Sequence, residues 1–177
     1  MERISSAELP AEGRVVIFGG GHITLPLVPI LKSVGFQVAI MDNEPDRVSA
    51  ERFPTADELI CGDFLHINDY VTLGDDDYAV IMTNGHEFDY EVQAQVLRCP
   101  TAYVGVLGHH LKFPEIHARL REEGISQEAL DAIHAPIGVP IRSNTSEEIA
   151  VSIAAQLIDC RAENRNHGEA ACPMHQE

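Results

Sequence analysis

Three glycines and an acidic residue are spaced in a pattern that could hold a phosphate and a ribose. Gly19, Gly20 and Gly21 follow the apolar run at 14–18, and a helical pattern comes after them. Such a turn lets the backbone approach a pyrophosphate, which the N-terminus of the next helix attracts. Asp42 ends the next apolar run, near the spacing of about 20 residues found in dinucleotide-binding proteins. The pattern predicts nucleotide binding; the alternative is a glycine-rich turn that holds no ligand.

Neighbouring residues refine this prediction. A carboxylate at Asp42 would bind ribose hydroxyls and repel a 2′-phosphate, which favours NAD(H) over NADP(H). Arg47 is close enough in sequence to oppose that preference. Thr24 stands where the third glycine of the usual motif would be, so we expect looser or differently angled packing of the helix on the strand.

A second polar cluster follows the fourth apolar run. Thr83, Asn84 and His86 are expected beyond the carboxyl end of a strand, where ligands bind in open parallel sheets. A structural interpretation, Asn84 as a helix cap with Glu87 as its partner, explains these two residues but not His86. His86 is therefore a candidate for ligand contact and for acid–base catalysis.

A third cluster combines Gly108, His109, His110 and Lys112 after the fifth apolar run. Gly108 would allow a close backbone approach, and His109 is a second acid–base candidate. The alternative is a polar helix cap. His134, further along, is interpreted as a structural hydrogen-bonding residue in preference to a ligand contact.

The predicted cofactor contacts share a position at the ends of the apolar runs. They are Gly19, Gly20, Gly21, His22, Ile23, Asp42, Asn43, Thr83, Asn84, His86 and Gly108.

The elements that must position these residues alternate between strand and helix. Several strand-like runs are continuously apolar, which is typical of parallel strands covered on both faces. The chain therefore predicts a Rossmann-like, doubly wound α/β fold with a mainly parallel sheet and helices on both faces. The expected strands are Arg14–Phe18, Gln37–Met41, Glu58–Cys61, Tyr78–Met82 and Ala102–Leu107.

Helical spacing of apolar residues occurs at 88–99 and 113–120, and most clearly after 145. Thr145 and Glu148 form a capping box that marks the start of the last helix. Pro26 and Pro29 should delay or bend the helix that follows the glycines.

The expected organisation is a leader at 1–13, one nucleotide-binding domain at 14–160 and a flexible polar tail at 161–177. The four cysteines are widely spaced and are interpreted as free thiols. His167, Cys172 and His175 could hold a soft metal in the tail, but we expect no metal site.

Composition excludes several function classes. The formal net charge of −16 argues against nucleic acid and against an anionic membrane surface as partners. The chain has no secretory signal pattern, no nucleophile-elbow motif GxSxG and no Walker lysine after its glycines. We expect a cytoplasmic protein that forms a homodimer.

The motifs together resemble a known family. The segments VVIFGGGHITLPLVPILKSVGF, RFPTADEL, VIMTNGHEFDYEV, YVGVLG and HAPIGVPIRSNTSEEIAVSIAAQLI resemble the Rossmann domain of the XdhC/CoxI family over 14–159. The resemblance implies an accessory factor for molybdenum hydroxylases such as xanthine dehydrogenase. It also implies handling of the molybdenum cofactor and a hydroxylase subunit or maturation partner.

The chain departs from the family pattern in two places. Family members commonly carry a preceding domain with a glycine-flanked cysteine motif, for which the residues before Arg14 leave no room. The usual GSRRK-like segment reads GHHLK at 108–112. Three functions stay open at this point: a maturation factor with a nucleotide site, an NAD-dependent oxidoreductase using His86 or His109, and an NAD(H)-sensing module. Whether the chain is an enzyme is left undecided.

Overall fold

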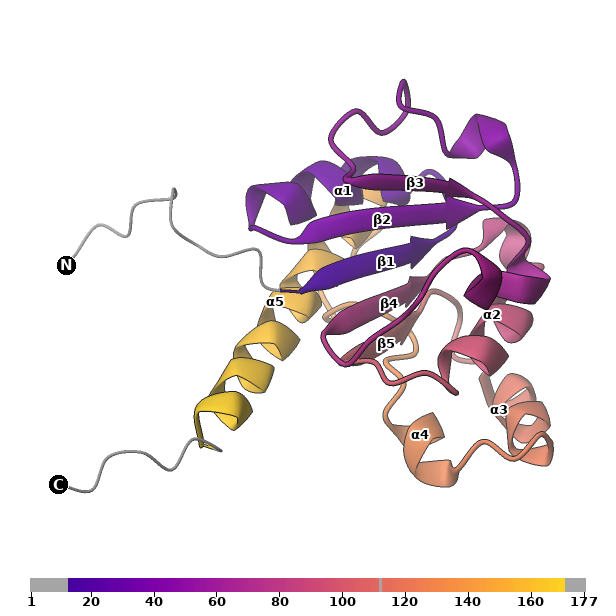
Figure 1. Cartoon of the computed structure of the whole chain (residues 1–177). Helices are drawn as coiled ribbons and strands as arrows, with labels where there is room; N and C mark the ends of the chain where they lie inside the picture. The colour runs from indigo at the N-terminus through magenta and orange to yellow at the C-terminus, as the bar shows by residue number, and fades with distance from the viewer. Residues whose placement is uncertain (1–12, 112, 171–177) are drawn as a thin grey trace, which may run out of the picture.

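The structure is a computed structural model that describes residues 13–111 and 113–170, the last five of them by backbone alone. This part of the chain contains five strands and five helices; only 3₁₀ turns separate β2, β3 and β4, and α3, α4 and α5 follow one another (Figure 1). The strands are β1 (Arg14–Phe18), β2 (Gln37–Asp42), β3 (Glu58–Cys61), β4 (Asp77–Ile81) and β5 (Tyr103–Val106). The helices are α1 (Thr24–Ser33), α2 (Asp89–Val96), α3 (Phe113–Glu122), α4 (Gln127–Asp131) and α5 (Ser146–Ala170). Short 3₁₀ turns are η1 (Pro45–Arg47), η2 (Phe64–Asp69) and η3 (Asn84–His86).

The sheet is parallel throughout, with the strand order β3-β2-β1-β4-β5. The chain leaves β1 toward β2 on one side and later returns to β4 on the other. At such a switch in direction, the loops after β1 and β4 diverge and leave a crevice at the carboxyl ends of the strands. The predicted doubly wound fold is confirmed, and each predicted strand lies within about one residue of an observed one.

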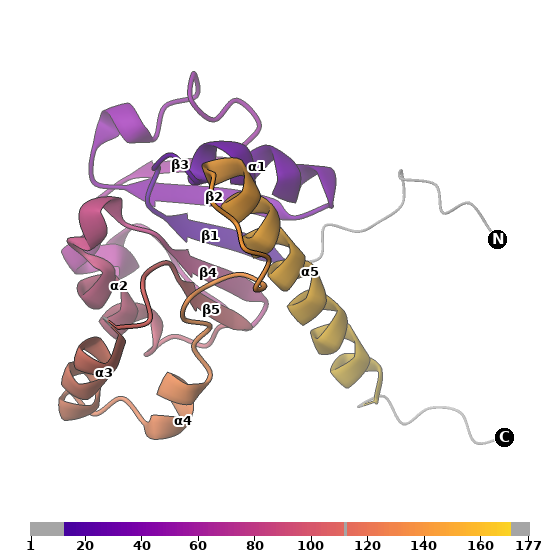
Figure 2. The same cartoon turned by 180° about the vertical axis from the view of Figure 1, so that it is seen from behind.

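Both faces of the sheet are covered, because successive side chains of each strand point to opposite faces. Val15 and Ile17 of β1 pack on the face that α1 and α5 cover, while Val16 and Phe18 pack toward α2 and η2. Figure 2 shows α1 and α5 in front of the sheet. A smaller apolar cluster joins α2 to α3 and α4. This two-sided burial is why the strands read as continuous apolar runs.

Helix α1 begins only at Thr24, after a turn at 21–23, and it contains Pro26 and Pro29. The delayed start agrees with the effect expected of the prolines. Residue 26 lies in the first turn, where the backbone N–H has no partner within the helix, so a proline costs little there.

The last helix differs from the prediction at its far end. The capping box is confirmed, because Thr145 Oγ1 accepts from the Glu148 N–H and Glu148 Oε2 accepts from the Thr145 N–H. The flexible tail predicted at 161–177 overlaps this helix, since α5 continues to Ala170. Arg161 donates to the carbonyl of Val34 and lies over the ring of Phe36, so tertiary contacts hold the helix beyond its apolar stripe.

Other predictions concern cysteines and membrane helices. Cys61, Cys99 and Cys160 are free thiols, as expected, whereas Cys172 and His175 lie outside the described residues, as does the side chain of His167. Within the described residues, no helix has the length and apolar character needed to cross a membrane.

Candidate functional site

The glycine corner between β1 and α1 contains glycines with two different roles. A side chain at Gly19, whose φ is +122°, would place its Cβ 2.1 Å from the carbonyl oxygen of Met82. A Cβ at Gly20 would lie 2.2 Å from the carbonyl oxygen of Arg47. Gly21 is different, because a Cβ there would meet nothing within 4 Å. Internal packing therefore requires the first two glycines, and the third borders open space.

Thr24 closes this corner from the helix side. Its side chain is buried, and its hydroxyl donates to the carbonyl of Gly19 over 2.6 Å. The threonine that replaces the expected third glycine thus ties the first turn of α1 to the end of β1.

Asp42, the predicted ribose contact, lies beneath the corner with 1% of its surface exposed. One carboxylate oxygen accepts from the Gly20 N–H over 2.8 Å, and the other accepts from the Glu44 N–H over 3.0 Å. In this structure the carboxylate therefore holds the backbone of two loops. Its contact with a ribose stays a prediction.

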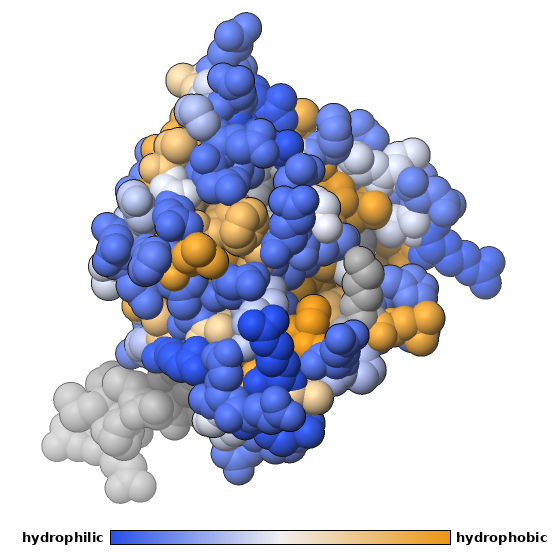
Figure 3. All heavy atoms as spheres, turned by 90° about the vertical axis from the view of Figure 1, so that its right-hand side faces the viewer, coloured by the Kyte–Doolittle hydropathy of each residue, from blue (hydrophilic) through white to orange (hydrophobic). Residues whose placement is uncertain are grey.

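A cavity of about 320 Å³ lies over the corner at the carboxyl edge of the sheet. Four of its lining residues were predicted from sequence as cofactor contacts: Gly20, Gly21, His22 and Asn84. The remaining lining residues are Glu44, Asp46, Arg47 and Arg52. Figure 3 views this side of the molecule, which is hydrophilic over most of its area, with scattered apolar side chains.

Two arginines bring positive charge to this cavity. The Nε of Arg47 lies 2.9 Å from Glu44 Oε2, and the Nη2 of Arg52 donates to the carbonyl of Gly20 over 3.1 Å. The Nε of Arg52 is buried and has no hydrogen-bond partner among the described residues. Arg52 was missed in the sequence, because it lies in a loop whose path over the glycines is fixed only by the fold.

His86 is held by a buried carboxylate. It is the residue of the second polar cluster that was predicted as a candidate for acid–base catalysis. Its Nδ1 lies 2.7 Å from Asp89 Oδ2, and Asp89 Oδ1 accepts from both the hydroxyl and the N–H of Thr83. Asp89 is 4% exposed, whereas the His86 side chain is 34% exposed. His86 also has a φ of +62°, uncommon for a residue with a side chain. A carboxylate that fixes one imidazole nitrogen leaves the other available for proton transfer or a hydrogen bond.

The remaining predicted contacts do not line the cavity. Asn43 is exposed, and Ile23 packs partly against the core on the α1 side of the sheet. Gly108 lies at the end of β5, where a Cβ would approach the ring of Phe113 to 3.2 Å. His109 and His110 are exposed and their ring centroids are 4.2 Å apart. Lys112 is outside the described residues.

His134 has the structural role favoured from sequence. Its N–H donates to Val104 and its carbonyl accepts from Val106, so it extends the sheet beside β5. Its ring stacks on Tyr103 at 4.6 Å between centroids. Burial lowers the pKa of His134, which favours the neutral imidazole in this stack.

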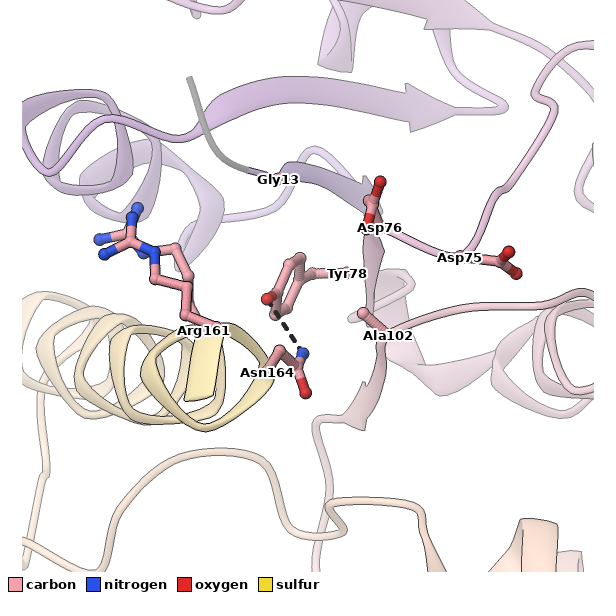
Figure 4. Close-up of a pocket in the computed structure, with 8 residues that line it drawn as sticks. Gly13, Asp75, Asp76, Tyr78, Ala102, Arg161 and Asn164 are labelled. Carbon is pink, nitrogen blue, oxygen red and sulfur yellow. Dashed lines mark hydrogen bonds between the residues drawn. The ribbon is translucent and has the colours of Figure 1, made fainter. Parts of the chain in front are cut away.

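A larger cavity, of about 470 Å³, lies at the opposite, amino edge of the sheet (Figure 4). Asn164 Nδ2 donates to the hydroxyl of Tyr78 there, over 3.2 Å. Its lining residues are Gly13, Asp75, Asp76, Tyr78, Ala102, Arg161, Asn164 and Arg165. Size alone does not make this cavity the candidate site, since ligands of parallel α/β sheets bind beyond the carboxyl ends of the strands.

The fold and corner can be compared with known proteins. Residues 15–157 match the family described as the XdhC Rossmann domain. The chain belongs to the XdhC Rossmann domain family. The resemblance seen in the sequence motifs is thereby confirmed.

Several relatives of this XdhC Rossmann domain are longer proteins. The chain is 28% identical over 163 residues to the uncharacterized protein YqeB of Escherichia coli strain K12, covering 92% of this chain and 30% of that protein. It is 26% identical over 148 residues to a probable xanthine dehydrogenase subunit of Bacillus subtilis strain 168, covering 84% of this chain and 43% of that protein.

A solved structure is also similar to this XdhC Rossmann domain. The crystal structure of a xanthine dehydrogenase from Bacillus halodurans aligns with a TM-score of 0.73 and 32% identity, over 92% of this chain and 45% of that one. The chain therefore spans less than half the length of each of these three proteins.

Proposed function

We propose that this chain is a nucleotide-binding Rossmann protein that serves a molybdenum hydroxylase of the xanthine dehydrogenase type as an accessory factor. The proposal of nucleotide binding rests on Gly21. This residue faces open space beside the cavity, where the strand order reverses direction between β1 and β4. Within the described part of the chain, no contact requires a glycine there, whereas close approach of a phosphate would.

The ligand classes that fit are a dinucleotide, NAD(H) first among them, and the phosphate-bearing pterin of the molybdenum cofactor. A volume of about 320 Å³ accommodates part of either molecule. Gly20 and Gly21 would lie along the phosphates, and Asn84 would contact the ligand from the β4 side. When bound, a nicotinamide would supply hydride chemistry and a molybdenum pterin would be cargo for the partner enzyme.

The accessory role rests on family membership and on the relatives named as xanthine dehydrogenase proteins. The expected homodimer and cytoplasmic location are part of the same proposal. With a net charge of −16, the surface suits contact with a partner protein better than attraction of a free anion.

A second candidate function is an NAD-dependent oxidoreductase. The His86–Asp89 pair favours it, because hydride transfer from an alcohol, or to a carbonyl in the reverse direction, also moves one proton. In this case Nε2 of His86 would exchange that proton with the substrate while Asp89 holds Nδ1.

One set of measurements separates the two functions. Purified protein is titrated with NADH and followed by nucleotide fluorescence, then assayed on a panel of alcohols and aldehydes. The accessory role predicts binding without turnover, together with co-purification of a hydroxylase subunit or a pterin chromophore. Turnover on the panel would favour the oxidoreductase. Absence of binding for NADH and for pterin nucleotides would refute the nucleotide site.

A further inference from the structure

We propose that the cavity over the glycine corner selects ligands that carry a phosphate monoester, and that Arg52 is the residue that recognises this group. The inference rests on the proposed nucleotide site and revises the order of its ligands, because NAD(H) carries no phosphate monoester and would bind less tightly than a ligand that does. The phosphate could be the 2′-phosphate of a dinucleotide or the terminal phosphate of a pterin.

The first argument concerns the charge that would normally reject such a phosphate. An acidic residue at the end of the second strand favours unphosphorylated ribose when its carboxylate faces the ligand. Here Asp42 is 1% exposed, and each of its oxygens already accepts a backbone N–H, from Gly20 and from Glu44. The carboxylate is therefore held beneath the loop, and its hydrogen-bonding capacity is directed at the protein.

The second argument concerns the position of the Arg52 guanidinium. Arg52 lines the cavity and its side chain is partly exposed, although its Nε atom is itself buried and closed to a ligand. The same guanidinium is anchored through Nη2 to the carbonyl of Gly20. Phe53, next along the chain, is 2% exposed, and the Arg52 guanidinium lies 5.7 Å from the centre of its ring. A guanidinium that is held in place at the wall of the cavity is suited to bind a phosphate oxygen.

The third argument concerns the other charges that line the cavity. Arg47 adds a second guanidinium, and its Nε is already engaged with Glu44. Glu44 has a half-exposed side chain, and Asp46 is exposed, so solvent screens both carboxylates. Within the described structure, neither carboxylate forms a hydrogen bond or an ion pair with Arg52, so neither of them neutralises its charge.

The test uses two pairs of probes that each differ by one phosphate: NADPH against NADH, and neopterin monophosphate against neopterin. Isothermal titration should show the phosphorylated member binding more tightly, by about tenfold or more, in at least one pair. The pair that shows the difference identifies the source of the phosphate. In Arg52→Met the difference should fall to less than about twofold.

Two further variants guard against a folding defect. Arg52→Lys keeps the positive charge but lacks the planar guanidinium, so the preference should be reduced and the melting temperature retained. Arg121→Met removes an exposed arginine that bonds Gln127, away from the cavity, and should leave the preference intact.

The outcomes separate this inference from the function on which it rests. Equal affinity for both members of each pair, in protein that binds them, overturns the phosphate preference and leaves nucleotide binding standing. A preference that survives in Arg52→Met overturns the role of Arg52. Absence of binding for every probe overturns the inference and the nucleotide site together.

Discussion

The N–H of Gly20 donates to the carboxylate of Asp42 over 2.8 Å, which joins the corner after β1 to the end of β2. The acid that would meet a ribose in a dinucleotide-binding protein here also supports the loop that would meet the phosphates. The shape of the corner therefore depends on the charge at residue 42.

Replacing Asp42 by asparagine should destabilise the fold. The amide retains one acceptor oxygen, so either the Gly20 N–H or the Glu44 N–H would face an NH₂ group in a buried position. We expect a loss of about 1–3 kcal/mol in the free energy of unfolding, measured by urea denaturation. The exposed Asn43→Ala is the matched control. Stability equal to wild type would mean that the two hydrogen bonds contribute nothing.

Replacing Asp42 by alanine tests the ribose prediction. If the carboxylate also contacts ribose, Asp42→Ala should weaken discrimination between NAD(H) and NADP(H), as read from the ratio of their dissociation constants. An unaltered ratio, in a variant that still binds nucleotide, would count against a ribose contact.

Replacing Gly21 by valine should remove nucleotide binding and leave the fold intact. A Cβ at this position meets no atom within 4 Å, so the added side chain enters only the space that a phosphate would need. Circular dichroism should give wild-type helix content, and NADH titration should give no fluorescence change. Wild-type affinity in Gly21→Val would refute the placement of the site.

Replacing Gly20 by alanine should instead destabilise the fold, and this variant is the matched contrast to Gly21→Val. Its Cβ would lie 2.2 Å from the backbone oxygen of Arg47, so the loop after β2 must move. We expect destabilisation of about 1–3 kcal/mol in thermal or urea unfolding. An unaffected melting curve would show that the loop accommodates the extra methyl group.

Helices and strands could be predicted from the sequence where the surroundings of a residue are set by residues close to it along the chain. Residues 14–18 are buried on both faces of a parallel sheet, so their sequence is largely apolar, and Thr145 and Glu148 interact only three residues apart. The surroundings of Asp42 and Arg52 were not predictable in the same way. Asp42 turns inward because Gly20 folds over it, and the orphaned Nε of Arg52 exists only once its loop crosses the corner. Likewise, α5 passes residue 161 because Arg161 contacts Val34, 127 residues earlier.

Replacing Asp89 by asparagine should release His86. Asp89 accepts from His86 and twice from Thr83, and this fixes neutral His86 as the tautomer with its proton on Nδ1. Nitrogen-15 NMR of histidine-labelled protein should show that tautomer in the wild type and a mixture in Asp89→Asn. The nearby exposed Glu87→Gln is the control. A mixed tautomer already present in the wild type would contradict the assigned geometry.

Glu148 should make stability depend on pH in the acid range. Backbone hydrogen bonds from Asn144 and Thr145 lower the pKa of Glu148 below its ordinary value of 4.5. Because the folded pKa is the lower one, the stabilisation is complete above that ordinary value and is lost as the pH falls through the folded value. Glutamine keeps an acceptor but no charge, so wild type should exceed Glu148→Gln in unfolding free energy at about pH 7, and this difference should shrink as the pH falls through the folded pKa of Glu148. Glu147→Gln, at an exposed neighbour, should show no such convergence in the same urea titrations. A gap between wild type and Glu148→Gln that stays constant across this range would show that the carboxylate does not act as the cap of α5.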